Sequence, residues 1–143
     1  MVNQQDNEAM YRSGQTQDDG PTNMILKELS FQIMAAAFEV HNTLGYGFLE
    51  SVYEKALMKE FRMRGIFAES QKTITVFYKG EEVGSYCADI VVDSKIILEL
   101  KAVEFLNRAH EAQLLNYLKG TGFKLGILIN FGKERVDSKR LVL

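Results

Sequence analysis

The chain shows no hydrophobic period over its first 22 residues, and a regular period begins near Met24. Residues 1–22 are rich in Gln, Asn, Asp, Ser and Gly, which is typical of a flexible polar tail, and Pro21 stands near its end. We therefore expect residues 23–143 to form the folded part of the chain, as a single domain.

Two helices are predicted at the start of this domain. A second helix, over roughly residues 48–64, follows the tight link "GYG" and ends before Gly65. The first helix ends at Gly45, and its apolar side chains recur at helical spacing. These apolar positions are Ile25, Leu29, Ile33, Ala36, Ala37 and Val40.

Three strands that form a meander are predicted next. The stretch "KTITVFYKG" alternates apolar and polar positions and ends at a "KGEE" turn. The stretches "EVGSYCADIVV" and "KIILELKA" follow and are joined at residues 93–95. Their apolar residues fill both faces, which is typical of strands at the centre of a sheet rather than at a wet edge.

One more helix and a further strand complete the pattern. "NRAHEAQLLNYLKGTG" is amphipathic and ends in glycines, and "KLGILINFG" is apolar enough for a strand buried on both faces. The last stretch, "VDSKRLVL", is either an edge strand or a tail. The order ααβββαβ predicts an α/β fold in which helices flank a central mixed β-sheet.

Composition adds little to this picture but excludes several classes of protein. Of the 143 residues, 46% are hydrophobic and 25% charged, and the net charge of -2 gives no overall positive field for nucleic acid. The single cysteine excludes an internal disulfide and favours a reducing compartment. With no signal peptide and no apolar run of membrane-spanning length visible, we expect a cytoplasmic protein without a membrane partner.

Three charges interrupt the most apolar part of the chain, "ADIVVDSKIILELKA". Asp89, Glu99 and Lys101 stand where burial of an unpaired charge is costly. Because side chains alternate along a strand, Glu99 and Lys101 share one face. A hairpin loop centred on Ser94 places Asp89 directly across from Glu99, whereas a two-residue loop shifts this register by one.

Two carboxylates opposite each other destabilise a strand pair, and a divalent cation between them removes the conflict. Mg²⁺ accepts one or two carboxylates together with waters and phosphate oxygens, so Asp89 and Glu99 are candidate ligands. The alternative is that Glu99 and Lys101 lie on a solvated sheet face and that Asp89 is incidental. The apolar residues on both faces of these strands favour the metal site.

Two motifs carry a resemblance to a known family. The first motif consists of Asp89, nine further residues and then "ELK". It resembles the signature of the PD-(D/E)XK phosphodiesterase superfamily, the fold of many restriction and repair nucleases. "GFLESVY" reads as G-x-x-E-x-x-Y and resembles the motif that names the GxxExxY family of that superfamily. The resemblance extends from about Leu26 to Leu143, and it departs from the signature at Ala88, where the superfamily name has Pro. It implies a restriction-endonuclease-like core.

The resemblance also implies roles for individual residues. Asp89, Glu99 and the carbonyl group of Leu100 would hold Mg²⁺ or Mn²⁺, which activates a water for attack on a phosphodiester. Lys101 would orient that water or stabilise the transition state. Glu50 matches the helical acid that reaches the metal site in related nuclease folds.

A helical wheel that starts at Leu49 places Glu50 inside the apolar arc, so its carboxylate is expected to point toward the protein. The alternative for Glu50 is a first-turn acid that favours the helix dipole. Glu54 lies farther round the wheel and is expected to be solvated. Tyr53 is expected in the core, with its hydroxyl able to orient Glu50.

The later helix carries a polar stripe of His110, Gln113 and Tyr117, at i, i+3 and i+7. Gln113 and Tyr117 match a Gln-x-x-x-Tyr motif of some superfamily branches. Gln113 would position water or substrate, and Tyr117 would stack on a base or bond a phosphate. The alternative is the polar edge of an amphipathic helix. His110 and Arg135 are further candidates for substrate binding, Arg135 because it lies in the basic cluster of residues 133–140.

We therefore expect a metal-dependent nuclease, a hydrolase that cleaves phosphodiester bonds of DNA or RNA by attack of a metal-activated water. The alternative is a catalytically silent nucleic-acid-binding, regulatory or protein-interaction module on the same fold, which the acidic net charge favours. A homodimer is left open, because small nucleases of this fold often work as dimers.

Overall fold

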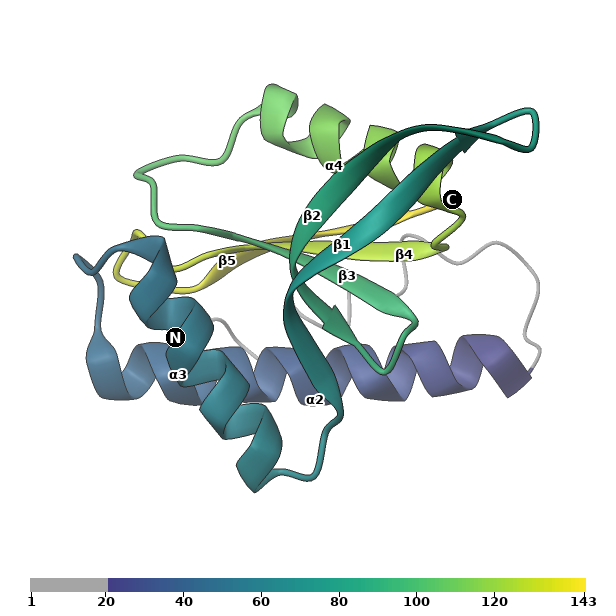
Figure 1. Cartoon of the computed structure of the whole chain (residues 1–143). Helices are drawn as coiled ribbons and strands as arrows, with labels where there is room; N and C mark the ends of the chain where they lie inside the picture. Colours follow the sequence, from purple (N-terminus) through teal and green to yellow (C-terminus); the bar gives the residue numbers. More distant parts are fainter. Residues whose placement is uncertain (1–20) are drawn as a thin grey trace.

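A five-stranded mixed sheet separates two layers of helices in the computed structural model, which describes residues 21–143 (Figure 1). Helices α2 (Pro21–Leu44) and α3 (Glu50–Met63) cover one face of the sheet, and α4 (Arg108–Thr121) covers the other. The strands are β1 (Ala68–Tyr78), β2 (Glu81–Val92), β3 (Ile96–Lys101), β4 (Leu125–Asn130) and β5 (Asp137–Val142).

The strands follow the order β1-β2-β3-β4-β5, in which only β3 and β4 run parallel. Helix α4 makes the crossover from β3 to β4 that parallel neighbours require. The predicted α/β fold with a central mixed sheet is thus confirmed. Of the two alternatives for "VDSKRLVL", the edge strand is observed, because β5 pairs with β4 along its length.

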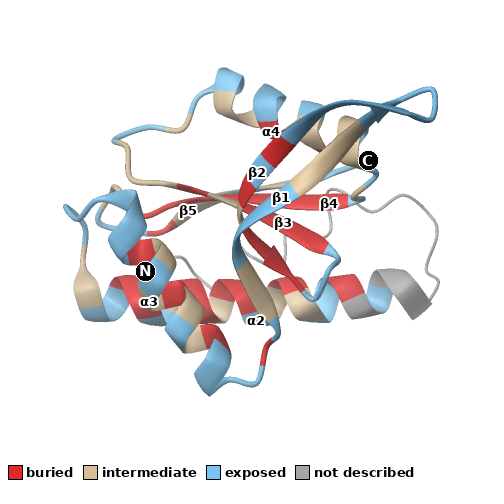
Figure 2. Cartoon of the chain, viewed as in Figure 1, coloured by how far each residue is buried: buried red, intermediate tan, exposed pale blue. Residues whose placement is uncertain are grey.

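Buried residues occur on the strands and on the helices of both layers (Figure 2), and the apolar side chains among them pack the sheet against both helix layers. In β3, Leu98 and Leu100 pack with α2 and α3, whereas Ile97 packs with α4. Glu99 and Lys101 are the residues of β3 that stay partly exposed. Strand β4 is buried along its whole length, as its apolar sequence predicts.

Glycines end both early helices where the sequence predicts. Gly45 has a left-handed φ of 74°, and its N–H donates to the carbonyl of His41 at 2.8 Å. Gly65, with a φ of 71°, follows α3. Helix α2 begins at Pro21, and most of the predicted tail, residues 1–20, lies outside the described residues. None of the described helices combines the length and apolar character needed to span a lipid bilayer.

The β1–β2 hairpin stays attached to the rest of the sheet only near the turn between β2 and β3. Strand β2 pairs with β3 over only three residue pairs, which end at Ile90 and Leu98. At the same level, Gln71 of β1 has a left-handed φ of 50° and is missing from the β1–β2 ladder. Farther out, Tyr86 of β2 packs with α4, so the hairpin bridges both helix layers (Figure 1). Strands β2 and β3 therefore separate at Asp89.

Candidate functional site

Asp89 and Glu99 oppose each other where β2 leaves β3. They lie one residue beyond the last ladder pair, Ile90 and Leu98, which is the register predicted for a loop centred on residue 94. The Oδ2 atom of Asp89 accepts a hydrogen bond from the N–H of Leu100 at 2.8 Å, and the Asp89 backbone hydrogen-bonds the Glu99 carboxylate. The two acids thus take up backbone groups that the parting strands leave without a ladder partner.

Burial dominates the electrostatics of Glu99. It raises the pKa of Glu99 from 4.5 to about 7, against the opposing effects of the Asp89 backbone and the charge of Lys101. The carboxylates of Glu50 and Glu54 raise this pKa further. The Oε1 atom of Glu99 is buried and has no hydrogen-bond partner within the described part of the chain. A buried carboxylate oxygen without a donor is unfavourable when it is ionised, so a proton or a cation would stabilise it.

A cavity of about 200 Å³ lies between the start of α3 and the parting strands. Its lining residues are Glu50, Ser51, Glu54, Gln71, Asp89 and Leu100. Three of these are acids, and the charges of the two helical acids also act on Glu99. Three carboxylates therefore line one small volume, with Glu99 near enough to two of them to be affected by their charges, and this gives the cavity a negative potential that attracts cations.

The donor set of this cavity fits Mg²⁺ or Mn²⁺. Carboxylate and carbonyl oxygens are hard ligands, and they suit these ions better than softer metals. Among residues 21–143, no three His, Cys, Asp or Glu side chains converge closely enough to form a complete metal cluster. Mg²⁺ does not need one, because it keeps several waters and takes one or two carboxylates and phosphate oxygens. Asp89 and Glu99 would supply that number.

The exposure predicted for Glu50 is wrong. Glu50 is the first residue of α3 and is exposed, although it lines the cavity. Helical periodicity does place Glu50 on the side of the buried residues, but Glu50 is the first residue of the helix and follows the N-cap Leu49, which is 77% exposed, so this end of the helix lies in solvent. The buried stripe of the helix consists of Tyr53, Leu57 and Phe61.

Glu54 is the acid of this site that the sequence reasoning missed. It was predicted to be solvated, but it is half-buried, lines the cavity and accepts a hydrogen bond from Nε2 of Gln71 at 2.6 Å. The amide oxygen of Gln71 in turn accepts from the thiol of Cys87 at 3.4 Å. The spacing of four residues between Glu50 and Glu54 is the signal that both acids lie on one side of α3.

Tyr53 fixes the loop that leads into α3. It is fully buried, as predicted, and its ring stacks on Phe131 with 4.7 Å between the centroids. Its hydroxyl donates to the carbonyl of Gly45 at 2.7 Å and accepts from the N–H of Phe48 at 3.3 Å. The hydroxyl therefore binds the loop backbone rather than Glu50, and it positions Glu50 indirectly by fixing where the helix begins.

Lys101 ends β3 on the same strand face as Glu99. Its side chain is partly buried, its charge lowers the pKa of Glu99, and its carbonyl accepts from the N–H of Phe131 at 2.8 Å. Within residues 21–143 the Lys101 ammonium forms no ion pair. It is therefore available to an anionic group that enters the site.

The polar stripe of α4 lies outside the acidic cavity. Gln113 is exposed and donates to the hydroxyl of Tyr117 at 2.9 Å, and Tyr117 stacks on Tyr86 of β2 with 3.5 Å between the centroids. His110 forms a capping box with Asn107: each side chain accepts a hydrogen bond from the other's backbone N–H. The structure thus joins Gln113 to Tyr117 but gives His110 a role in starting the helix.

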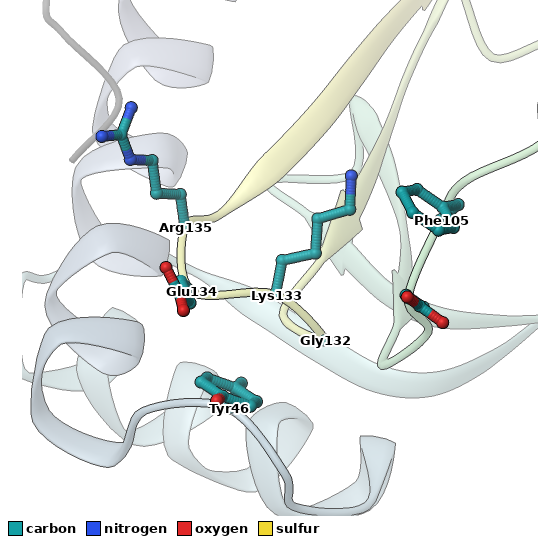
Figure 3. A pocket seen from close by; sticks show the side chains of 7 residues that line it. Tyr46, Phe105, Gly132, Lys133, Glu134 and Arg135 are labelled. Atoms are coloured by element: carbon teal, nitrogen blue, oxygen red, sulfur yellow. The ribbon is translucent and has the colours of Figure 1, made fainter.

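Arg135 lies at a second, larger cavity of about 570 Å³, next to Lys133 (Figure 3). The predicted basic cluster therefore does border a concave surface, but this surface is separate from the acidic cavity in its lining residues.

Comparison with known proteins gives a family match and a distant structural likeness. A family model for the PD-(D/E)XK nuclease superfamily matches residues 27–141. Among solved structures, the crystal structure of SSO0001 is similar over 80% of this chain and 77% of that chain, at 16% identity and a TM-score of 0.45. A likeness at that level carries no argument about function. No curated protein matches the chain.

Proposed function

The chain belongs to the PD-(D/E)XK nuclease superfamily, and we propose that it is a metal-dependent phosphodiesterase that cleaves nucleic acid. One observation carries the proposal: Glu99 lies across from Asp89 and has a buried oxygen with no hydrogen-bond partner among residues 21–143, beside a cavity lined by further acids. Such a group of carboxylates is unfavourable until a cation joins it. We further propose membership of the GxxExxY family, on the motif of Gly47, Glu50 and Tyr53.

The residues that would hold Mg²⁺ or Mn²⁺ are Asp89, Glu99 and the carbonyl group of Leu100, with Glu50 and Glu54 in reach through water. A divalent ion bound there lowers the pKa of a coordinated water and neutralises charge on the scissile phosphate. Glu99, whose pKa is raised to about 7 by burial, is then held in its ionised form.

Lys101 supplies the positive charge of the protein at this site. It shares a strand face with Glu99 and has no ion pair within the described chain, so its ammonium can stabilise the charge that develops on the phosphate or orient the attacking water. Gln113 and Tyr117 would contact the substrate from α4, and Arg135 would contact its backbone from the larger cavity.

Cleavage by matched lysine variants tests this assignment. The protein is incubated with single-stranded, duplex and branched DNA and with RNA, in Mg²⁺ or Mn²⁺. Lys95→Ala is the control, since Lys95 is exposed in the turn of the β2–β3 hairpin that carries Lys101, and it pairs with Asp93 at 3.2 Å. We expect cleavage by the wild type and by Lys95→Ala, and cleavage at least ~100-fold slower in Lys101→Ala. Equal cleavage by both variants would refute the assigned site.

A second candidate is a catalytically silent binding or regulatory module on the same fold. It is favoured by the lack of three converging metal-ligand side chains among residues 21–143 and by the net charge of -2. Oligonucleotide binding without cleavage in either metal would support it. For both candidates we propose the cytoplasm as the location, because a lone free cysteine, Cys87, suits a reducing compartment.

A further inference from the structure

The larger cavity lies beyond the C-terminal ends of the parallel strands β3 and β4, where three loops meet (Figure 3). Its volume of about 570 Å³ falls in the range of small-ligand pockets. Two aromatic rings, two cations and two carboxylates line it: Tyr46, Phe105, Lys133, Arg135, Glu104 and Glu134. Except for Arg135, none of these residues has a role in the proposed reaction.

The two aromatic side chains of the cavity are largely open to solvent. Tyr46 is 58% exposed and Phe105 is 65% exposed. The ammonium of Lys133 lies 4.5 Å from the centroid of the Phe105 ring, so a cation and an aromatic face are already combined there. Exposed aromatic faces beside cations are the surfaces on which proteins stack the bases of unpaired nucleic-acid strands.

Buried polar side chains fix the floor of this cavity. Asn130 is fully buried, accepts from the N–H of Val103 at 3.0 Å, donates to its carbonyl at 2.8 Å, and accepts from the N–H of Gly132 at 3.0 Å. His41 is also buried, and its Nε2 lies 2.7 Å from the carbonyl oxygen of Lys133. Two of the three buried polar side chains in the described chain thus hold these loops, which indicates a preformed site.

The same loops pack too closely for any larger residue at Gly132. A Cβ atom there would overlap the backbone of Val103. The third loop, which carries Tyr46, is fixed by the bond between the Tyr53 hydroxyl and the carbonyl of Gly45. All three walls of the cavity are therefore held in place before a ligand arrives.

The larger cavity and the acidic cavity share one loop. Tyr46 lines the larger cavity and Glu50 lines the acidic one. They are four positions apart along the chain, so their Cα atoms lie within ~14 Å of each other. On the other side, Lys101 ends β3, and Glu104 lines the larger cavity three residues later. A strand whose phosphate lies at Lys101 can therefore place a neighbouring nucleotide in the larger cavity.

We propose that the larger cavity holds one unpaired nucleotide of the substrate, beside the phosphate that is cleaved. The base stacks on Tyr46 or Phe105, and its phosphate faces Lys133 and Arg135. The carboxylates of the lining are suited to accept hydrogen bonds from exocyclic amines of a base. A base that stacks on Tyr46 or Phe105 must first leave its stacked neighbours, which a base inside an intact duplex does not do without cost. The inference rests on the proposed function and narrows its substrate to strands with unpaired nucleotides.

Binding in EDTA, where no metal-dependent cleavage occurs, tests this proposal. A short labelled oligodeoxycytidylate and a blunt duplex of equal length are titrated with protein while fluorescence anisotropy is recorded. We expect the single strand to bind more tightly, and we expect Tyr46→Ala and Phe105→Ala to weaken it by roughly 5- to 100-fold. Tyr46→Leu and Phe105→Leu, which keep apolar volume but lack the ring, should weaken it as well.

The β1–β2 hairpin offers matched control variants. Tyr78 is 61% exposed and Phe77 is 57% exposed, and the ammonium of Lys79 lies 5.3 Å from the Tyr78 ring centroid. Tyr78→Ala and Phe77→Ala should leave binding unchanged. Equal effects of the cavity and hairpin variants would overturn the proposal, and so would an equal loss of single-strand and duplex binding in the cavity variants.

Because binding is measured without cleavage, the test of the nucleotide site is independent of the test of nuclease activity. If the cavity variants lose single-strand binding, the nucleotide site in the larger cavity is supported, even when the wild type cleaves nothing. A wild type that cleaves nothing refutes only the nuclease proposal. If Lys101→Ala loses cleavage but the variants of Tyr46 and Phe105 bind single strands normally, the nuclease proposal stands. Only the nucleotide site in the larger cavity is then refuted. Lys133→Ala and Arg135→Ala should each lower the salt slope of single-strand binding by ~0.7 if they face phosphates.

Discussion

Asp89 and Glu99 face each other across the parting strands β2 and β3, and each is tied to the strand of the other by a hydrogen bond. Asp89 accepts from the N–H of Leu100 at 2.8 Å, and the Asp89 backbone bonds the Glu99 carboxylate. The arrangement closes the end of the ladder, but it leaves Oε1 of Glu99 buried without a partner within the described chain. In the metal-free protein a proton can neutralise this buried carboxylate, and a cation bound between the parting strands would do the same.

The stability of the metal-free protein should fall as the pH rises from about 4.5 to about 7. Burial raises the pKa of Glu99 from 4.5 to about 7, so in this range the folded chain binds a proton that the unfolded chain has released. The contribution of this group is greatest below pH 4.5 and is lost as the pH rises through 7. It amounts to at most ~3 kcal/mol. Urea unfolding in EDTA at several pH values measures it.

The variant Glu99→Gln should remove this pH dependence and should be more stable than the wild type at pH 8 in EDTA. Its side chain has no charge to bury, whereas the wild type must hold an ionised carboxylate among other acids. Glu82→Gln, at an exposed position of the hairpin, is the control and should change little. A loss of stability in Glu99→Gln at pH 8 would instead indicate a structural charge network.

Tyr53→Phe should destabilise the fold by ~1–2 kcal/mol, because it removes the hydroxyl that binds the backbone of Gly45 and Phe48. The stacking on Phe131 is kept. Cleavage should fall as well, since the loop that leads to Glu50 loses its fixed position. Urea unfolding measures the first effect, with Tyr78→Phe as an exposed control. Unchanged stability would mean that the hydroxyl does not hold the loop.

Gln71→Gly should be more stable than Gln71→Ala by about 1 kcal/mol, because position 71 has a left-handed φ of 50° that strains any side chain with a Cβ atom. Both variants lose the hydrogen bond to Glu54, so their difference reports the backbone alone. Urea unfolding of the two variants side by side measures it. An alanine variant as stable as the glycine variant would contradict a left-handed backbone conformation at position 71.

Local patterns were enough to predict most of the fold. Glycines at positions 45 and 65 end the first two helices as expected, and the apolar run of β4 is buried on both faces. The start of β1 was missed: "KTITVFYKG" placed it at Lys72, but the strand begins at Ala68. Its first residues are mostly polar and join the sheet through pairing with the end of β2, which periodicity does not record.

The sequence predicted those parts of the acidic site whose positions depend on residues close together in the chain. The opposition of Asp89 and Glu99 follows from the three-residue hairpin loop. The solvated position expected for Glu54 is wrong, because its burial depends on how α3 packs against the sheet and on the hydrogen bond from Gln71. Asn130 gave no signal either, since its hydrogen bonds reach Val103, 27 residues away along the chain. Contacts of this range depend on the folded topology.

The central claim is that Asp89 and Glu99 hold a divalent cation, and the melting temperature at pH 8 tests it most directly. Millimolar Mg²⁺ or Mn²⁺, compared with EDTA, should raise the melting temperature of the wild type, since a ligand of the folded state stabilises it. Asp89→Ala and Asp89→Asn should remove the rise. Asp93→Ala, at an exposed acid of the same hairpin, should keep it. No rise in the wild type, or an equal rise in the Asp89 variants, would contradict the claim.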